Sequence, residues 1–414
     1  MAQSNHSLKK PWIETPLIES AALSKVAGWY VYKINSFHNL PSAKHQQSTV
    51  EFSSNSNSCS PRDHSNPGTS VRQQSSPTSE RERISRIKRG IGNLIRTALL
   101  HPTNKDKNLH FYSSSGGNAG LAAIAAARDL GCPCTVVVPH STKPFMIGKL
   151  RAAGATDVVQ HGASWFEADT FLRRSYIENK DCDDHADADS KQTQKNIYVP
   201  PFDHPDIWTG AGTMVTEIAA QLPPREDSES ARGAFPADAI ICSVGGGGLF
   251  NGIVEGLDTY AHLHPRAGSQ TPVKPVRVVA AETEGADSLA YSLRAGSLQS
   301  LRAITSLATS LGALCVSPRT FEYARSPPEG VEVVSFVGSD GDAARGVVRL
   351  ADETRLQVEL ACGISIEAAV ATKLKATVPD LRPDSRVVVV VCGGSNVSAE
   401  MIADYRLRLQ DGWN

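Results

Sequence analysis

The sequence predicts an α/β fold with two open parallel-sheet lobes and one long disordered insertion. From residue 107 onward, short runs of β-branched and other apolar residues alternate with helical patterns. These runs lack polar alternation, which is typical of strands covered by helices on both faces of a sheet. Repeated strand–helix units favour parallel sheets, and 414 residues are enough for two lobes with cores of their own.

The elements follow one another in a regular order. The strand-like runs are LHFYSSS, CTVVVP, ATDVVQHG, DAIICSV, VRVVAAE and SRVVVVVC. Helical patterns separate them, among them NAGLAAIAAARDLG, KPFMIGKLRAAG, SWFEADTFLRRSYIEN and LFNGIVEGLDTYAHL, and SAEMIADYRLRLQ ends the series. We assign residues 89–178 to a smaller α/β domain, and residues 11–32 and 196–414 to a larger domain.

Two polar stretches interrupt this order. Residues 41–80 hold twelve serines and neither Leu nor Ile, a composition that predicts disorder; the whole insertion is assigned to residues 34–88. Residues 179–195 are rich in Asp and Lys. Their Asp and His side chains are compatible with a metal site, but we interpret this stretch as a flexible, solvated acidic loop.

Composition excludes several classes of function. The net charge of −1 argues against a surface for nucleic acid. No apolar run approaches the roughly 20 residues of a membrane helix, and the N-terminal stretch lacks the apolar core of a signal peptide. Cys132 and Cys134 have no second pair with metal-site spacing. We therefore expect reduced thiols and a cytoplasmic location.

Three polar turns follow strand-like runs, at the place where an open α/β sheet normally binds its ligand. They are SSSGGNAG at 113–120, SVGGGGLFNG at 243–252 and VVCGGSN at 390–396. A glycine run before a helix exposes successive N–H groups, which suit a phosphate. None of these turns ends in Gly-Lys-Ser/Thr, so none fits the Walker (P-loop) pattern. A nicotinamide-dependent dehydrogenase is the weaker alternative, because no acidic residue stands near position 265.

The sequence resembles the serine/threonine dehydratases, pyridoxal-phosphate (PLP) enzymes of the tryptophan-synthase-β-like fold. The resemblance rests on motifs in the family's order, over residues 11–32 and roughly 89–414. These motifs are PWIETPLIESAALSKVAG, SSSGGNAG, YVPPFDHPDIWTGAG, SVGGGGL, AAETEGADS and VVCGGSN. A cysteine in the last motif makes the chain most similar to the eukaryotic catabolic L-serine dehydratases.

The resemblance implies roles for individual residues. Asn118 is expected to bind the 3-hydroxyl of the cofactor ring, and Ser115, Gly116 and Asn118 to bind substrate. Cys392 is expected to face the pyridine nitrogen, where a thiol is a poor proton donor and leaves the ring largely unprotonated, which favours β-elimination. The residues expected to hold the cofactor phosphate are Gly245, Gly246, Gly247 and Gly248.

The resemblance also implies a monovalent cation, expected to be K⁺, near Glu282 and Ala286. Relatives of this fold often form homodimers, and the same state is expected here. The implied reaction is that of an L-serine ammonia-lyase, which converts serine to pyruvate and ammonia, and threonine to 2-oxobutanoate. The choice between these two substrates stays open, because one methyl group changes selectivity by only about 1–3 kcal/mol.

The lysine that such chemistry requires is out of register. The family carries it in Ser-x-x-Phe-Lys-x-Arg-Gly, where it forms a covalent imine with the cofactor and then acts as general base. Alignment on Arg89 and Gly90 places Ile87 at that position, so Lys88 is one residue late. Lys44 is a second candidate. In the alternative interpretation neither lysine is competent, and the chain is a catalytically impaired or inert member of the fold.

The family pattern stops after Lys33 and resumes at Arg89. Two such sharp junctions around a serine-rich segment lead to the hypothesis that residues 34–88 are a translated intron or arise from a misplaced exon boundary.

Overall fold

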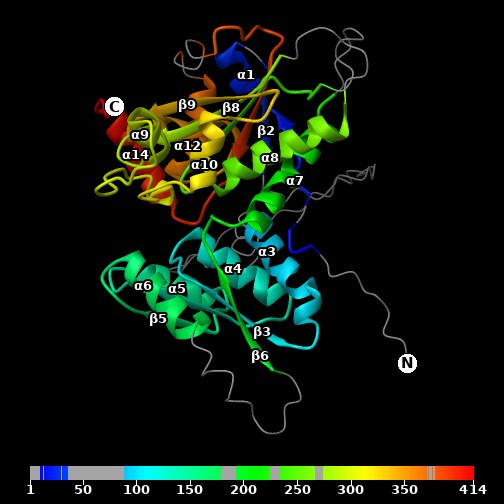
Figure 1. Ribbon diagram of the computed structural model, residues 1–414. Coiled ribbons are helices and arrows are strands. Elements are labelled where there is room, and N and C mark those ends of the chain that lie inside the picture. The colour runs from blue at the N-terminus through cyan, green and yellow to red at the C-terminus, as the bar shows by residue number, and fades with distance from the viewer. Residues whose placement is uncertain are drawn as a thin grey trace, which may run out of the picture.

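The computed structural model describes residues 10–12, 14–28, 30–35, 88–178, 193–223, 234–265, 274–370, 372, 375 and 378–414. Figure 1 shows two lobes, each built around its own sheet, with helices α3 and α7 where the lobes meet. The predicted α/β class with two sheet lobes is confirmed.

The larger sheet has six strands in the order β1-β2-β10-β7-β8-β9. All neighbours run parallel except β1 and β2, which pair antiparallel at one edge. The central strands are almost wholly buried, as expected for a parallel sheet covered on both faces. The strands are β1 (Leu17–Glu19), β2 (Tyr30–Asn35), β7 (Ala239–Ser243), β8 (Val276–Thr283), β9 (Val331–Gly338) and β10 (Arg386–Val391).

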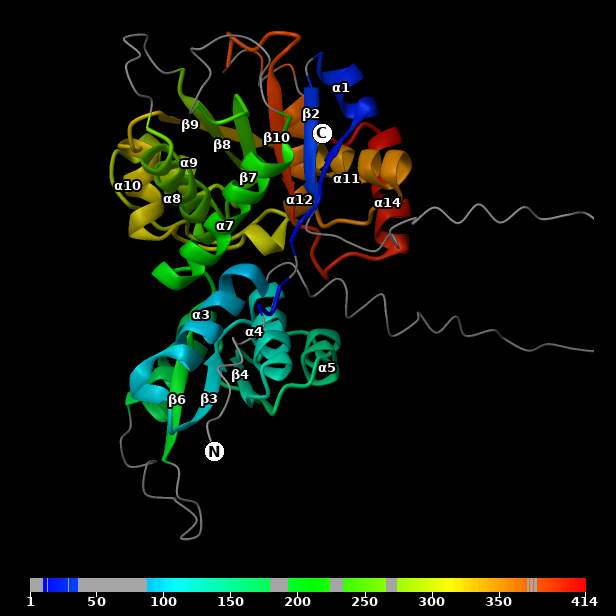
Figure 2. The ribbon, with the colours of Figure 1, turned by 90° about the vertical axis from the view of Figure 1, so that its right-hand side faces the viewer.

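Two helical layers cover this sheet (Figure 2). Apolar side chains of the first layer pack on one face, and those of the second layer pack on the other. The first layer consists of α7 (Pro205–Gln221), α8 (Gly248–Leu263), α9 (Ser288–Ala295) and α10 (Pro318–Arg325). The second consists of α1 (Ala21–Ala27), α11 (Asp340–Thr354), α12 (Leu360–Val370) and α14 (Ala399–Gln410).

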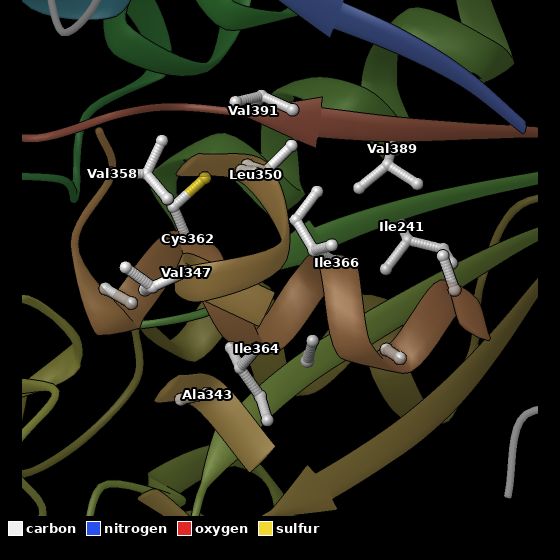
Figure 3. Packing of buried hydrophobic residues seen from close by; sticks show 14 of the residues in the cluster. Ile241, Ala343, Val347, Leu350, Val358, Cys362, Ile364, Ile366, Val389 and Val391 are labelled. Carbon is white, nitrogen blue, oxygen red and sulfur yellow. The ribbon is translucent and has the colours of Figure 1, made fainter. Parts of the chain in front are cut away.

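Helix α12 is mostly apolar because it lies between the sheet and α11, and its one charged residue, Glu367, pairs with Arg345 and Arg349 of α11. Figure 3 shows Ile366 directed toward Ile241 and Val389 of the sheet, while Ile364 lies beside Ala343 of α11. A helix in such a position needs no polar face. Its first turn begins just after a charged residue, Glu359, which becomes important below.

The smaller sheet has four parallel strands in the order β5-β4-β3-β6. They are β3 (Asn108–Ser113), β4 (Cys134–Val138), β5 (Asp157–Gln160) and β6 (Gln194–Val199). Helices α3 (Lys88–Leu100), α4 (Asn118–Asp129) and α5 (Pro144–Ala152) pack on one face. Helix α6 (Trp165–Leu172) and the π-helical turn η2 (Arg173–Glu178) pack on the other.

Strand β6 shows where the two domains divide. It pairs with β3 along its whole length, from Asn108↔Gln194 to Ser113↔Val199. The sequence-based range for the larger domain, which begins at residue 196, therefore includes most of a strand of the smaller sheet. The sequence-based acidic loop, 179–195, likewise extends into this strand, and its residues 179–192 lie outside the described part of the chain.

The insertion assigned to residues 34–88 is shorter at both ends. Ile34 is fully buried in β2 and pairs with Val390, because β2 continues to Asn35. At the other end Lys88 is the first residue of α3. Residues 36–87, which carry the predicted disorder, lie outside the described residues.

Helices α3 and α7 cross at very short range. A Cβ on Gly90 would lie 2.9 Å from the carbonyl oxygen of Ile207, and a Cβ on Gly210 would lie 2.6 Å from that of Arg89. Only glycine therefore permits this crossing. Ile207 and Trp208, at the start of α7, pack in the core of the smaller lobe, so α7 joins the two lobes mechanically.

An ion pair fixes the same crossing. Both terminal nitrogens of Arg89 donate to the carboxylate of Glu217 in α7, at 2.7 and 2.8 Å. Arg89 also donates to Thr213, at 2.7 Å, and to Thr15. The side chains of Arg89 and Glu217 are 6% and 15% exposed. This network anchors the first turn of α3 to α7 and to the N-terminal segment.

Two further expectations from the sequence concern membrane-spanning helices and disulfide bonds. No helix in the described ranges is long and apolar enough to cross a bilayer. No disulfide joins the six cysteines that the structure describes, and burial raises the pKa of both Cys134 and Cys242 to about 12.

Replacing Arg89 by Met should lower the free energy of unfolding by about 3–5 kcal/mol, since it leaves the Glu217 carboxylate buried without its cation. Urea unfolding followed by circular dichroism measures this. The matched control is Arg406→Met, which removes an exposed bidentate pair with Asp352 and should cost under about 1 kcal/mol. Equal losses in the two variants would contradict the anchoring role of Arg89.

Candidate active site

Three loops meet at the carboxyl ends of the parallel strands, between the two lobes. They follow β3 in the smaller lobe and β7 and β10 in the larger lobe. Hydrogen bonds join the first loop to the third across the gap between the lobes. The three polar turns singled out in the sequence are thus neighbours in space, as the general geometry of open α/β sheets requires.

The glycine loop after β7 is an anion cradle. In the described part of the chain, no hydrogen bond is found from the N–H groups of Gly245, Gly246 and Gly247. These groups lie at the N-terminus of α8, a helix of 16 residues, where the helix dipole also favours an anion.

Side chains cannot be added to this cradle. A Cβ on Gly246 would lie 2.2 Å from the ring of Phe202, and one on Gly247 would lie 1.8 Å from the hydroxyl of Thr320. Gly247 also has a φ of +97°, in the left-handed region that favours glycine. Phe202 and Thr320 therefore form the walls of the loop, and each requires the absence of a side chain opposite it.

The loop after β3 is held against the helix that it opens. The carbonyl oxygen of Ser115 lies so close to Gly120 that a Cβ there would be 1.8 Å away. The hydroxyl of Ser115 accepts a hydrogen bond from the N–H of Gly117, at 3.3 Å. Gly116 packs near Val138. The backbone from Ser115 to Gly117 is thus partly exposed at the start of α4.

Asn118, the first residue of α4, connects the lobes. Its amide nitrogen donates to Glu359 at 3.0 Å and to Ser310 at 3.3 Å. Its amide oxygen accepts from both the N–H and the hydroxyl of Ser395, at 3.1 and 2.7 Å. A side chain of the smaller lobe is therefore oriented entirely by partners from the larger lobe.

Glu359 is the carboxylate at the centre of this contact. It is 5% exposed, and it accepts hydrogen bonds from Asn118, from the hydroxyl of Ser310 and from the N–H of Asn396, the last at 2.7 Å. A Cβ on Gly394 would lie 2.1 Å from the carboxyl carbon of Glu359. The loop after β10 is thus shaped around this carboxylate.

The same loop makes further contacts with the smaller lobe. Lys149 of α5 donates to the carbonyl oxygen of Ser395 at 2.6 Å. Cys392 follows the last residue of β10, is half-buried and packs at the edge of a core cluster. These contacts hold the loop after β10 against the smaller lobe, and the Cys392 thiol lies at the end of a central strand of the larger sheet.

Glu282 lies apart from these three loops, at the end of β8. It is fully buried, and its oxygens accept hydrogen bonds from the N–H groups of Leu289 and Ala290, at 2.9 and 2.8 Å. Burial raises its pKa to about 8, although these two N–H groups oppose the shift. Ala286, its predicted partner, is also fully buried.

Of the two lysine candidates, only Lys88 lies in the part of the chain that the structure describes. Lys88 begins α3, whereas Lys44 and Ile87 lie outside the described residues. Lys33 is 3% exposed in β2, and burial lowers its pKa. It pairs with Val389, two residues before the end of β10, so its backbone lies inside the sheet and not in any of the three loops.

Four residues of this site were missed in the sequence: Phe202, Ser310, Thr320 and Glu359. Glu359 had a usable signal, since it is a single carboxylate in the otherwise apolar stretch LQVELACGIS. Phe202 lies within the motif YVPPFDHPDIWTGAG but had no assigned role. Ser310 and Thr320 lie in polar sequence without any pattern, and only the fold brings them to the loops.

Comparison with known proteins shows the family to which the chain belongs. The model of the family described as pyridoxal-phosphate dependent enzymes matches residues 88–393. The chain is 38% identical to a catabolic L-serine/threonine dehydratase of Saccharomyces cerevisiae, over 74% of this chain and 78% of that protein. It is 37% identical to a serine dehydratase-like protein of Rattus norvegicus, over 72% and 79% of the two chains.

A solved structure extends this similarity to nearly the whole fold. A fungal L-serine ammonia-lyase from Rhizomucor miehei superimposes with a TM-score of 0.69 at 27% identity, covering 97% of this chain and 99% of that one.

The residues present fit pyridoxal phosphate. The side-chain-free glycine loop with its unbonded N–H groups suits the phosphate, and the amide of Asn118 is a hydrogen-bonding group of the kind that the ring's 3-hydroxyl needs. Since the family model covers well over half of the sequence, from residue 88 to residue 393, the chain belongs to the pyridoxal-phosphate-dependent enzymes.

Proposed function

We propose that the protein is an L-serine ammonia-lyase that eliminates water from serine and yields pyruvate and ammonia. The observation that carries this proposal is the 38% identity to a catabolic L-serine/threonine dehydratase. The side-chain-free glycine loop and the contacts of Asn118 across the two lobes support it. Threonine, with one more methyl group, is the second substrate that we propose.

When bound, the cofactor supplies an electron sink for the carbanion formed at Cα. The N–H groups of Gly245, Gly246 and Gly247 hold its phosphate. The Ser115–Gly117 backbone and the Ser115 hydroxyl bind the substrate carboxylate. Asn118 would bind the 3-hydroxyl of the ring by exchanging one of its present partners, because Ser310, Glu359 and Ser395 engage its amide.

Cys392 supports elimination over other reactions at Cα. A carboxylate facing the pyridine nitrogen would keep that nitrogen protonated, whereas a thiol is a weak donor. With the Cys392 thiol opposite it, the ring nitrogen would stay largely unprotonated, which would favour β-elimination over reactions that need a long-lived carbanion.

We further propose a K⁺ ion beside Glu282, a homodimeric state and a cytoplasmic location. Glu282 supports the K⁺ proposal. Its carboxylate is fully buried and accepts hydrogen bonds from N–H groups, so a bound cation would balance its negative charge and let it stay ionised. The second and third follow from the resemblance and from the reduced thiols.

The test of the proposed function is a serine-dependent pyruvate assay. We expect pyruvate from the 414-residue chain, and at least about 10²-fold more from a version in which the family's lysine-bearing segment replaces residues 34–88, because a correctly placed general base contributes roughly 10²–10⁴-fold. The matched control is that version with its segment lysine changed to alanine. If neither the chain nor the replaced version forms pyruvate, the proposed function is wrong.

A second prediction concerns the lysine register. The double substitution Ile87→Lys and Lys88→Ile restores the family's spacing before Arg89, and it should increase the share of chains that carry covalently attached cofactor. Borohydride reduction followed by mass spectrometry of peptides locates the pyridoxyl group. The single variant Lys44→Ala is the control and should leave the attachment unchanged. An adduct at Lys88 in the parent, with less adduct in the double variant, would show that the spacing argument is wrong.

A third prediction tests the cation. K⁺ should stabilise the protein by about 1.4 kcal/mol at ten times its dissociation constant, relative to choline at equal ionic strength. The Glu282 pKa of about 8 lies above the ordinary value, so at pH 6 a proton neutralises the carboxylate and competes with K⁺. The K⁺ effect on the melting temperature should therefore grow between pH 6 and pH 9, and disappear in Glu282→Gln. A K⁺ effect that survives in this variant would remove Glu282 from the site.

A further inference from the structure

The buried carboxylate of Asp169 has no role in the site described above. Asp169 lies in α6, on the face of the smaller sheet away from α3 and α4, and is 6% exposed. Its Oδ1 accepts hydrogen bonds from the Ser114 hydroxyl at 2.6 Å and from the Tyr198 hydroxyl at 2.5 Å. Its Oδ2 accepts from Nε of Arg173 at 2.8 Å.

The two donors to Oδ1 stand where neighbouring strands become site loops. Ser114 follows the last residue of β3 and directly precedes Ser115. Tyr198 is the second-last residue of β6, which pairs with β3 up to Ser113↔Val199. Four residues after Tyr198 comes Phe202, whose ring lies against the glycine cradle.

Arg173 strengthens this cluster from outside. Its guanidinium lies 4.4 Å from the centre of the Tyr198 ring and donates to the Tyr198 hydroxyl at 3.2 Å. Burial raises the pKa of Tyr198 to about 12, and the hydrogen bond to Asp169 adds to the shift. Tyr198 therefore remains a donor throughout the physiological range. Because Arg173 is 48% exposed, the buried contacts of the cluster are those at Oδ1.

We propose that Asp169 is a positioning residue for the substrate: through Ser114 it fixes the loop that binds the substrate carboxylate, and through Tyr198 it fixes the segment that carries Phe202. This inference rests on the proposed function, because it deepens the role of the loop from Ser115 to Asn118. A hydrogen bond from the residue next to the binding loop holds the backbone in place without touching substrate. Small displacements of such a loop weaken binding of the substrate carboxylate more than they slow the later steps.

The two oxygens of Asp169 allow a sharp test. Ser114→Ala and Tyr198→Phe each remove one donor at Oδ1, whereas Arg173→Met removes the donor at Oδ2 and leaves Oδ1 occupied. Asp169→Asn retains the shape but offers one acceptor oxygen where there were two. The control is Asp129→Asn, at the far end of α4, where the carboxylate is 38% exposed.

The first measurement is hydrogen exchange of the peptide 113–118 in the full chain. Exchange should accelerate about tenfold in Ser114→Ala and Asp169→Asn, the change expected from roughly 1.4 kcal/mol of lost local stability. Tyr198→Phe should accelerate exchange mainly in residues 199–204. Arg173→Met should change both segments less, and Asp129→Asn neither. Unchanged exchange at 113–118 in Ser114→Ala and Asp169→Asn would overturn the proposal.

The second measurement is the serine kinetics of the same variants, made in the version with the family's lysine segment. KM should rise about tenfold in Ser114→Ala and Asp169→Asn, while kcat changes less than about threefold. Equal losses in kcat and kcat/KM, or normal kinetics despite faster exchange, would show that Asp169 is only structural. If Asp169→Asn does not fold, Ser114→Ala decides the question. If the parent has no serine activity, the proposed function fails, while the exchange data still decide whether Asp169 fixes the loop.

Discussion

The buried pair of Arg89 and Glu217 is the interaction on which the remaining geometry depends. It joins the first turn of α3, the middle of α7 and Thr15 of the N-terminal segment. Each of these belongs to a different part of the fold: α3 packs in the smaller lobe, α7 crosses both lobes, and the N-terminal segment leads to strands β1 and β2. Breaking a buried pair leaves an uncompensated charge. The three parts therefore cannot separate without this free-energy cost. The close Gly90–Gly210 crossing beside the pair makes the arrangement still less adjustable, because close-packed backbones cannot slide past each other without losing contacts.

Above this rigid junction the site is closed by polar contacts. The side chain of Asn118 forms its hydrogen bonds with Ser310, Glu359 and Ser395 of the larger lobe, and Glu359 accepts hydrogen bonds from three segments of the chain. A buried carboxylate with three hydrogen bonds is stable only while its donors stay in place. Glu359 therefore links the loop after β10 to the amide of Asn118, and so couples the two lobes.

Local patterns were sufficient for part of this structure. Continuous β-branched runs predicted the parallel strands, and the four glycines of 245–248 indicated a tight turn from strand to helix, which the structure shows between β7 and α8. Both signals depend on neighbours in the chain. Glu359 and Asp169 were not found, since each is defined by donors 29 to 241 residues away in the sequence. The sequence-based assignment of residues 194–199 differs from the structure for the same reason. Whether β6 joins the smaller or the larger sheet depends on its pairing with β3, which its own residues do not specify. Ile34 extends β2 for a similar reason, because Val390 beside it completes the core.

These constraints also bear on the lysine. A helix turns about 100° per residue, so an offset of one position could in principle be corrected by rotating the start of α3. The Arg89–Glu217 pair opposes that rotation, since it would separate two groups whose separation costs about 3–5 kcal/mol, and the Gly90–Gly210 contact opposes it sterically. The register of α3 is therefore set by Arg89 and cannot follow the lysine. A competent lysine must be delivered by the chain that precedes residue 88, either by a lysine at the family's spacing or by a different path of the backbone into the space between Asn118 and Cys392. The described part of the chain thus contains the side-chain-free glycine loop and Asn118, whereas the lysine depends on the segment before residue 88, where the match to the family model begins.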